Sequence, residues 1–152
     1  MSTALADLLP EVQAAATRAL SDLKARDILA VVTYTLRTTA EQKALYAQGR
    51  QDLLTVNAMR DAAGLPHIGQ SDNAYTVTNC DGVSLAQGGK GRSPHQLGRA
   101  LDVVPLGPAG PMWPAPNDPR WEDIANSFEA EGFEWGGRWK GFVDLPHYQM
   151  MG

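Results

Sequence analysis

The order of its helix-like and strand-like segments most constrains the fold of this 152-residue chain. Residues 4–26 place apolar side chains at helical spacing, with a start or a kink predicted at Pro10. The next segment, ILAVVTYT (28–35), is apolar and β-branched, which is typical of a strand. Thr39 can cap a second helix that ends near Gly49.

The rest of the chain does not alternate strands and helices in a β-α-β order. Residues 51–74 carry only weak periodicity and end in a polar loop, whereas residues 75–79 and the segment RALDVV (99–104) are strand-like. Asp118, followed by a proline, predicts the start of a helix that ends near Gly132, and a last short strand is expected near the C-terminus. We therefore predict an α+β fold with a small, mainly antiparallel sheet flanked by helices.

Length and composition exclude several classes of protein. One domain comprising residues 1–152 is expected, because the chain can bury a core and contains no repeat or linker. The net charge of -4 argues against a nucleic-acid-binding protein, and no segment approaches the run of ~20 apolar residues that spans a bilayer. A single cysteine, Cys80, excludes an intrachain disulfide and a cysteine-rich zinc site. The N-terminal residues lack the pattern of a signal peptide, and the glycine-rich residues 81–92 are predicted to form a mobile loop.

The stretch SPHQLGRALD places a histidine and an aspartate seven positions apart. In the strand-like part, alternation puts Asp102 on one face and Leu101 and Val103 on the other, so these two can anchor in the core while Asp102 faces a cleft. Gly98 permits a turn that brings His95 back beside Asp102. A carboxylate held on a strand is stiff, which suits a metal ligand.

A second stretch near the C-terminus, DLPHYQ, repeats the pairing of carboxylate and imidazole. Pro146 restricts the preceding residue to extended geometry and positions His147. His95, Asp102 and His147 then make a three-ligand set in a cleft over the sheet, which leaves zinc an open fourth position for water. Zinc lowers the pKa of that water to about 7. Asp144, three residues before His147, could face the same cleft and act as the base that moves the water's proton.

His67 and the tryptophans are not part of the predicted metal site, and one other class of metal enzyme uses the same types of ligand. His67, in GLPHIG, is interpreted as a surface loop residue. The tryptophans are interpreted as core or cleft-wall residues, and Trp135 is the one expected to touch a substrate. A non-haem Fe(II) oxygenase also uses two histidines and a carboxylate, but it needs no nearby proton-shuttling carboxylate, so Asp144 weighs against that class.

Three ordered motifs resemble one family of zinc peptidases. SPHQLGRALD fits the pattern S-x-H-x-x-G-x-A-x-D, and DLPH fits the closing D-x-P-H, of the zinc D-Ala-D-Ala carboxypeptidase and L-alanyl-D-glutamate endopeptidase family. LRTTAEQKALYAQGR is similar to an early segment of that family, and EWGGRWKGFVDLPHYQ is similar to the ending of its bacteriophage endolysin branch. The matching segments lie between about residues 33 and 150. Leu36, where an aromatic residue is common, and the long glycine-rich insert depart from the pattern.

The resemblance implies one Zn²⁺ per chain, held by the same three ligands, with Asp144 as the catalytic base. It also implies that Arg37 contacts the substrate or its polarised carbonyl, and that Ser93 holds a substrate carboxylate. Gln42 is a further candidate for substrate binding. Arg37 and Gln42 could instead brace the start of the helix that follows them.

We therefore predict a zinc peptidase that cleaves peptidoglycan stem peptides between L-alanine and D-glutamate, as a monomeric, bacteriophage-type endolysin. It is expected to bind neither nucleic acid nor membranes, and to be cytoplasmic until it reaches the periplasm or cell wall by holin-type export. One alternative is a D-Ala-D-Ala carboxypeptidase or dipeptidase, because Arg37 and Ser93 could bind a free terminal carboxylate. Another is a non-catalytic wall-binding virion protein.

Overall fold

The computed structural model describes the whole chain except residues 78–79 and 81–92. The glycine-rich loop predicted at 81–92 therefore lies outside the described residues. The rest groups into two compact units, a first with Met1 and Arg37–Leu97 and a second with Ser2–Leu36 and Gly98–Gly152. The single domain predicted for residues 1–152 stays a prediction. In the described part of the chain, no helix is long and apolar enough to cross a membrane.

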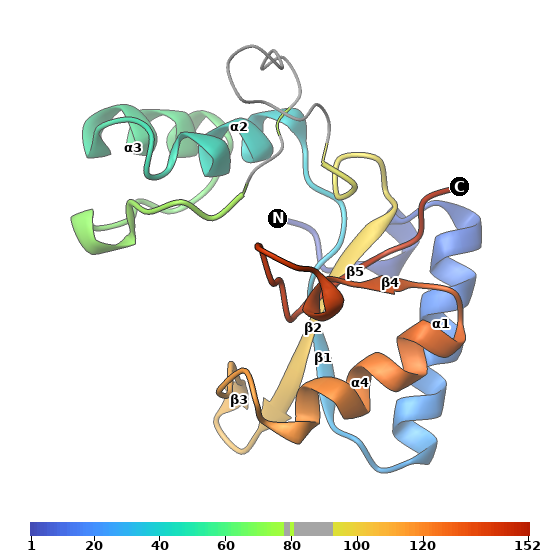
Figure 1. Ribbon diagram of the computed structural model, residues 1–152. Helices are drawn as coiled ribbons and strands as arrows, with labels where there is room; N and C mark the ends of the chain where they lie inside the picture. The colour runs from blue at the N-terminus through green and yellow to red at the C-terminus, as the bar shows by residue number, and fades with distance from the viewer. Residues whose placement is uncertain (78–79, 81–92) are drawn as a thin grey trace. The chain divides into compact units, whose positions relative to one another are not determined.

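The second unit contains the sheet and two long helices (Figure 1). Its elements are η1 (Leu5–Asp7), α1 (Pro10–Ala25), β1 (Ala30–Tyr34), β2 (Ala100–Gly107), β3 (Gly110–Pro111), α4 (Pro119–Ala130), β4 (Glu134–Trp135), η4 (Gly136–Arg138) and β5 (His147–Gln149). The strands follow the order β1-β2-β5-β4, β3 pairs with β2, and every described pair is antiparallel. This arrangement confirms the predicted α+β fold with a small antiparallel sheet.

The core of this unit lies between the sheet and the helices α1 and α4, which pack against each other. Phe128 of α4 stacks on Tyr148 of β5, with ring centroids 4.4 Å apart. Leu101 and Val103 of β2 are fully buried, as predicted. Burial of one such side chain contributes roughly 1.5–3 kcal/mol to folding. Asp102, which lies between them in the sequence and stays partly exposed, is therefore carried by a strand that is firmly held.

Both long helices begin where the sequence predicts a start. Pro10 and Pro119 each occupy the first turn, where the missing N–H removes no helical hydrogen bond. Asp118 caps α4 and accepts a hydrogen bond from the backbone N–H of Arg120 at 3.0 Å. Gly132 follows α4 with a φ of +93°, a conformation that favours glycine and ends the helix.

The first unit contains the helices α2 (Thr39–Ala47) and α3 (Leu53–Ala62) and the short η2 (Gln70–Asp72), with α2 packed on α3. The cap of α2 is Thr38, so the prediction of Thr39 as the cap is wrong by one residue. The Thr38 side chain accepts from the N–H of Glu41, whose carboxylate accepts in turn from the N–H of Thr38. This reciprocal pair satisfies two otherwise unpaired donors, and it can form only when the cap precedes Glu41 by three positions.

Two predictions in the first unit differ from the structure. The sequence showed only weak periodicity where α3 lies, because one of its two buried residues, Arg60, is charged. The Arg60 guanidinium donates to Gln48 Oε1 at 2.7 Å, so a polar contact replaces the apolar stripe that periodicity detects. The strand predicted at residues 75–79 is absent over residues 75–77, the described part of that segment.

Candidate metal centre and active site

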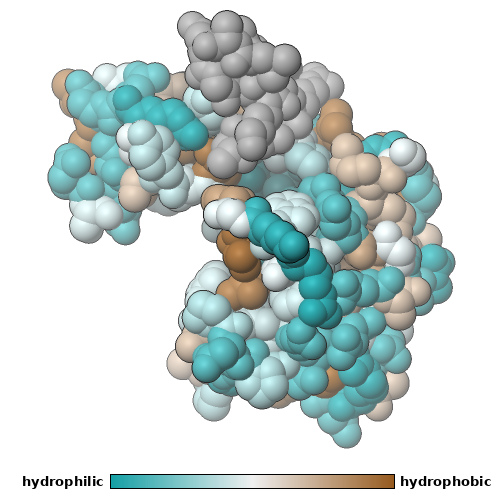
Figure 2. Space-filling model, viewed as in Figure 1, coloured by the Kyte–Doolittle hydropathy of each residue, from teal (hydrophilic) through white to brown (hydrophobic). Residues whose placement is uncertain are grey.

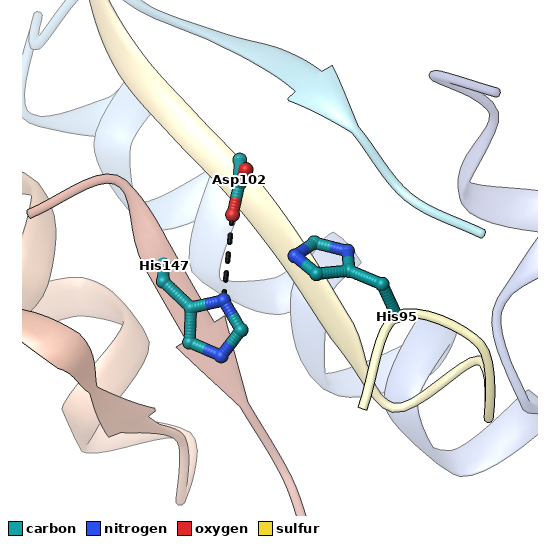
Figure 3. Close-up of side chains that lie close together, drawn as sticks. All are labelled: His95, Asp102 and His147. Carbon is teal, nitrogen blue, oxygen red and sulfur yellow. Dashed lines mark ion pairs between the residues drawn. The ribbon is translucent and has the colours of Figure 1, made fainter. Parts of the chain in front are cut away.

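Two of the predicted ligands face each other across the pairing of β2 with β5. Asp102 and His147 are direct partners in this antiparallel register (Figure 3). Side chains of directly opposite residues lie on the same face of a sheet. Asp102 Oδ1 lies 3.5 Å from His147 Nδ1. A shift of the register by one residue would send the two side chains to opposite faces, so the pairing of β2 with β5 forms this half of the site.

His95 lies in the turn at residues 94–98 that runs into β2. The turn is closed by hydrogen bonds from Gln96 N to Ser93 O at 2.9 Å and from Leu97 N to Pro94 O at 3.2 Å. Gly98 ends it with a φ of +68°, which confirms the predicted need for glycine at this position. The His95 side chain is buried.

His95, Asp102 and His147 each offer one ligand atom, and these atoms all lie within 4.8 Å of one another (Figure 3). Ligand atoms roughly 2.0–2.1 Å from a tetrahedral zinc ion lie about 3.3 Å from one another. The distance of 3.5 Å from Asp102 to His147 is close to that value. Two imidazoles and a carboxylate are also donors that zinc accepts. The three side chains could therefore hold a metal ion.

Gln149 fixes which nitrogen of His147 is free for a ligand role. Its amide Nε2 donates to the Glu134 carboxylate at 2.7 Å, so its Oε1 is the atom that faces His147 Nε2, at 2.8 Å. In the neutral imidazole Nε2 then carries the proton, and the lone pair lies on Nδ1, which faces Asp102. Metal-binding histidines are commonly oriented in this way. The sequence analysis missed Gln149, although its place two residues after His147 on a strand puts both on one face.

Asp144 approaches the same nitrogen of His147. Its Oδ2 lies 3.9 Å from His147 Nδ1, and its side chain is 34% exposed. Burial alone would lower the pKa of the His147 imidazole, but Asp102, Asp144 and Gln149 together raise that pKa above its usual value. The electrostatic environment at Nδ1 thus favours a positive charge, which is the property that a cation site requires.

The remaining predicted residues of the first unit surround the backbone of His95. The Arg37 N–H donates to His95 O at 3.1 Å, and the His95 N–H donates to Ser93 Oγ at 3.2 Å. The Arg37 guanidinium donates to Gln42 Oε1 at 3.3 Å, and all three predicted residues are buried. These contacts support the turn that carries His95, while substrate binding by Arg37, Ser93 and Gln42 stays a prediction.

The aromatic residues are distributed in a way that the sequence did not reveal. Trp135 is 4% exposed, and its indole N–H donates to Leu145 O at 2.7 Å. Trp139 is partly exposed, and its ring centroid lies 5.2 Å from that of His147. Trp139 is therefore the tryptophan beside His147, whereas the sequence analysis singled out Trp135, because no sequence signal distinguished the two. His67, as predicted, is a surface residue, bonded to Asp61 at 2.7 Å.

The loop between η4 and β5 adds an apolar surface next to Asp144. Phe142 and Val143 are 48% and 54% exposed. Figure 2 shows hydrophobic side chains gathered over this loop. A partly exposed carboxylate beside exposed apolar side chains is an arrangement that can contact a ligand through both polar and apolar groups.

Comparisons with known proteins agree with this geometry. Residues 87–150 match the model of a family described as D-alanyl-D-alanine carboxypeptidase. A 58-residue segment is 41% identical to the L-alanyl-D-glutamate peptidase of Listeria phage A118, covering 38% of this chain and 21% of the phage protein. Over 154 aligned positions the chain is 29% identical to the peptidoglycan L-alanyl-D-glutamate endopeptidase CwlK of Bacillus subtilis, covering 95% of this chain and 74% of CwlK.

A solved structure shares the fold. The L-Ala D-Glu endopeptidase ChiX of Serratia marcescens superposes with a TM-score of 0.56 at 24% identity, over 97% of this chain and 83% of ChiX. The match to the family model includes all three residues that could hold a metal ion and Asp144. The resemblance predicted from the sequence motifs, to the carboxypeptidase and endopeptidase family, is confirmed.

Proposed function

We propose that this relative of the D-alanyl-D-alanine carboxypeptidase family is a zinc peptidase that hydrolyses the stem peptides of peptidoglycan. The observation that carries the proposal is the convergence of three ligand atoms within 4.8 Å of one another. A structural cluster of two histidines and one aspartate would have no need of a second carboxylate, yet Asp144 lies 3.9 Å from His147 Nδ1. A metal-binding set with an adjacent, partly exposed carboxylate is the composition that metal-assisted hydrolysis requires.

Each residue has a separate task in this proposal. His95, Asp102 and His147 would hold the ion, and Gln149 would keep the lone pair of His147 on Nδ1. Bound zinc would lower the pKa of water to about 7 and so supply a nucleophile at neutral pH. Asp144 would accept a proton from the attacking water at its carboxylate and donate it to the leaving amine, which is general acid–base catalysis by one group.

We further propose that the bond cleaved joins L-alanine to D-glutamate. This is supported by the names of the phage and Bacillus relatives, both of which specify that bond. In a stem peptide the D-glutamate keeps a free α-carboxylate, because the chain continues through its γ-carboxyl group. The guanidinium of Arg37 and the hydroxyl of Ser93 are the groups that could pair with that carboxylate. Trp135 stays a further candidate for contact with the substrate.

We also propose a role in phage lysis, which one of the two relatives supports. The relative from Listeria phage A118 supports a bacteriophage-type endolysin. The substrate lies in the cell wall, so we propose that a monomer leaves the cytoplasm by holin-type export and acts in the periplasm or wall. The proposed partner is the stem peptide alone, with neither nucleic acid nor membrane.

The second candidate function is a D-Ala-D-Ala carboxypeptidase, which is favoured by the description of the matched family. Such an enzyme releases free D-alanine from the end of the stem. It would use Arg37 and Ser93 to bind the terminal carboxylate. The two candidates use the same metal centre and differ only in which bond is presented to it.

Mass spectrometry of purified peptidoglycan after digestion tests the proposal. We expect fragments with a new D-glutamate amine and little free D-alanine, and we expect both zinc chelation and Asp144→Asn to abolish their formation. Release of D-alanine with intact L-Ala-D-Glu bonds would identify the carboxypeptidase. A digest unchanged by the zinc-loaded protein would disprove peptidase activity on this substrate.

A further inference from the structure

We infer that Trp135 and Gly136 are positioning residues that hold Asp144 at its distance from His147. The inference rests on the proposed function, because it assumes that Asp144 is the base. It concerns the short segment Trp135–Arg138, which leads from β4 into η4 and whose sequence, WGGR, has no role in the metal centre itself.

Two hydrogen bonds tie this segment to the backbone on either side of the Asp144 side chain. The Asp144 N–H donates to Gly136 O at 3.0 Å. The Trp135 indole N–H donates to Leu145 O at 2.7 Å. The peptide group that precedes Asp144 and the one that follows Leu145 are therefore both held by the same two residues.

Gly136 also allows a close approach that a side chain would prevent. A Cβ atom at this position would overlap the Asp144 carbonyl oxygen and would lie 3.0 Å from Asp144 Cβ. Backbone atoms cannot move away as the end of a flexible side chain can. Any residue larger than glycine would therefore displace Asp144 rather than be accommodated beside it.

The segment itself is anchored to α4. The Arg138 guanidinium pairs with Glu122 at 2.7 Å and with Glu129 at 3.0 Å, and it lies 4.8 Å from the centroid of the Trp135 ring. Surface ion pairs contribute little each, but a guanidinium with two partners and an aromatic face beneath it has few alternative positions. Trp135 is thereby held in one orientation.

The loop that carries Asp144 is not packed on every side. An open cavity of about 440 Å³ is lined by Val143 and Leu145, the two neighbours of Asp144, together with Trp135 and residues of α4. The loop therefore has space to move toward α4 if its hydrogen bonds to Trp135 and Gly136 are lost. Displacement of a reacting group by about 1 Å can cost roughly 100-fold in rate, so these two bonds are expected to matter for turnover.

The test compares Gly136→Ala and Trp135→Phe with wild type, and uses Gly69→Ala as the matched control. An added Cβ at Gly69 would have no neighbour within 4 Å. We expect both test variants to bind one zinc per chain with an unchanged Kd, and to lose about 10- to 100-fold in kcat with KM within a few-fold of wild type. The ¹³Cγ resonance of Asp144 should shift in both variants, with or without metal, and Gly69→Ala should change none of these values.

Asp144→Asn separates this inference from the proposed function. Retained turnover in Asp144→Asn would remove the base from the mechanism and so reject that part of the proposed function. If Asp144→Asn is inactive while both test variants turn over normally, the positioning role is wrong and the proposed function stands. Loss of zinc in the test variants would also overturn the inference, because the segment would then support the metal site. If Gly136→Ala fails to fold, the kcat and zinc affinity of Trp135→Phe alone test the positioning role.

Discussion

Gln149 offers a sharp test of how the metal centre is organised, because it touches a ligand without being one. Replacement of Gln149 by methionine keeps an unbranched side chain of similar length but removes the oxygen that accepts from His147 Nε2 at 2.8 Å. His147 is 6% exposed, so water cannot easily take the place of that acceptor. The imidazole is then free to rotate or to move its proton to Nδ1, the atom that faces Asp102.

The expected cost follows from two independent estimates. Loss of an outer partner of a metal-bound histidine typically weakens metal binding roughly 10- to 100-fold, which is about 1.4–2.7 kcal/mol. A buried donor left without an acceptor costs about 1–3 kcal/mol. Because the two ranges agree, Gln149→Met should raise the Kd for zinc about 10- to 100-fold.

The assay is a competitive titration of metal-free protein with zinc and a chromogenic chelator at one neutral pH. The matched control is the double variant Gln149→Glu with Glu134→Gln, which exchanges the positions of the amide and the carboxylate. This pair keeps an acceptor for His147 and a hydrogen bond between the two strand partners, so its zinc affinity should stay near wild type. If Gln149→Met binds zinc as tightly as wild type while His147→Ala does not, the orienting role is refuted.

Three further predictions concern the ligands, the cap of α2 and Arg37. The variant with alanine at all three predicted ligands should bind no zinc in the same titration, and a full equivalent of zinc in it would contradict the assignment. Thr38→Ala should cost about 1 kcal/mol, or roughly 2–4 °C in Tm at this chain length. Burial would raise the pKa of Glu41, but the Thr38 backbone N–H and the N-terminal amine together lower that pKa below its usual value. The resulting stabilisation is complete above the unfolded pKa and lost as the pH falls through the folded one, so wild type and Thr38→Ala, which keeps the backbone N–H, should both lose stability in acid. Arg37→Lys should lower kcat/KM for stem peptides about 10-fold or more, because a two-pronged donor is lost, whereas Arg50→Lys, at an arginine stacked on Tyr46, should not.

The sequence predicted those parts of the site that depend on local rules. Alternation along β2 is local, and so are the turn at Gly98 and the extended residue before Pro146, so His95, Asp102 and His147 could be proposed together. The capping of α4 by Asp118 was predictable for the same reason. The outcome for α3 was different, because a buried guanidinium that bonds to another helix cannot be distinguished from a solvated charge in the sequence.

Residue roles that depend on the register between strands could not be predicted from the sequence. Alternation along β5 puts Gln149 on the face of His147, but the orientation of its amide depends on the pairing of β4 with β5, which places Glu134 opposite Gln149. The same pairing places Trp135 opposite Tyr148, within the core. Positions 135 and 139 are both tryptophan, and the sequence does not distinguish them. The strand pairing buries Trp135, whereas Trp139 lies beside His147.

The segment from β4 through η4 to β5 contains residues that act on the ligand His147 and other residues that act on Asp144. On the strand side, Glu134 and Gln149 act on Nε2 of His147, the nitrogen that faces away from Asp102. On the loop side, Trp135 and Gly136 act on the backbone around Asp144 and make no contact that reaches a ligand atom in the described structure. Substitutions on the strand side should therefore change zinc affinity, and substitutions on the loop side should change turnover. Because the strand side acts on His147 and the loop side on the backbone around Asp144, their effects on the free energies of metal binding and of the transition state should add in a combined variant. A double variant of Gln149→Met and Trp135→Phe whose free-energy effects do not add would show that the segment from β4 to β5 positions ligand and base together.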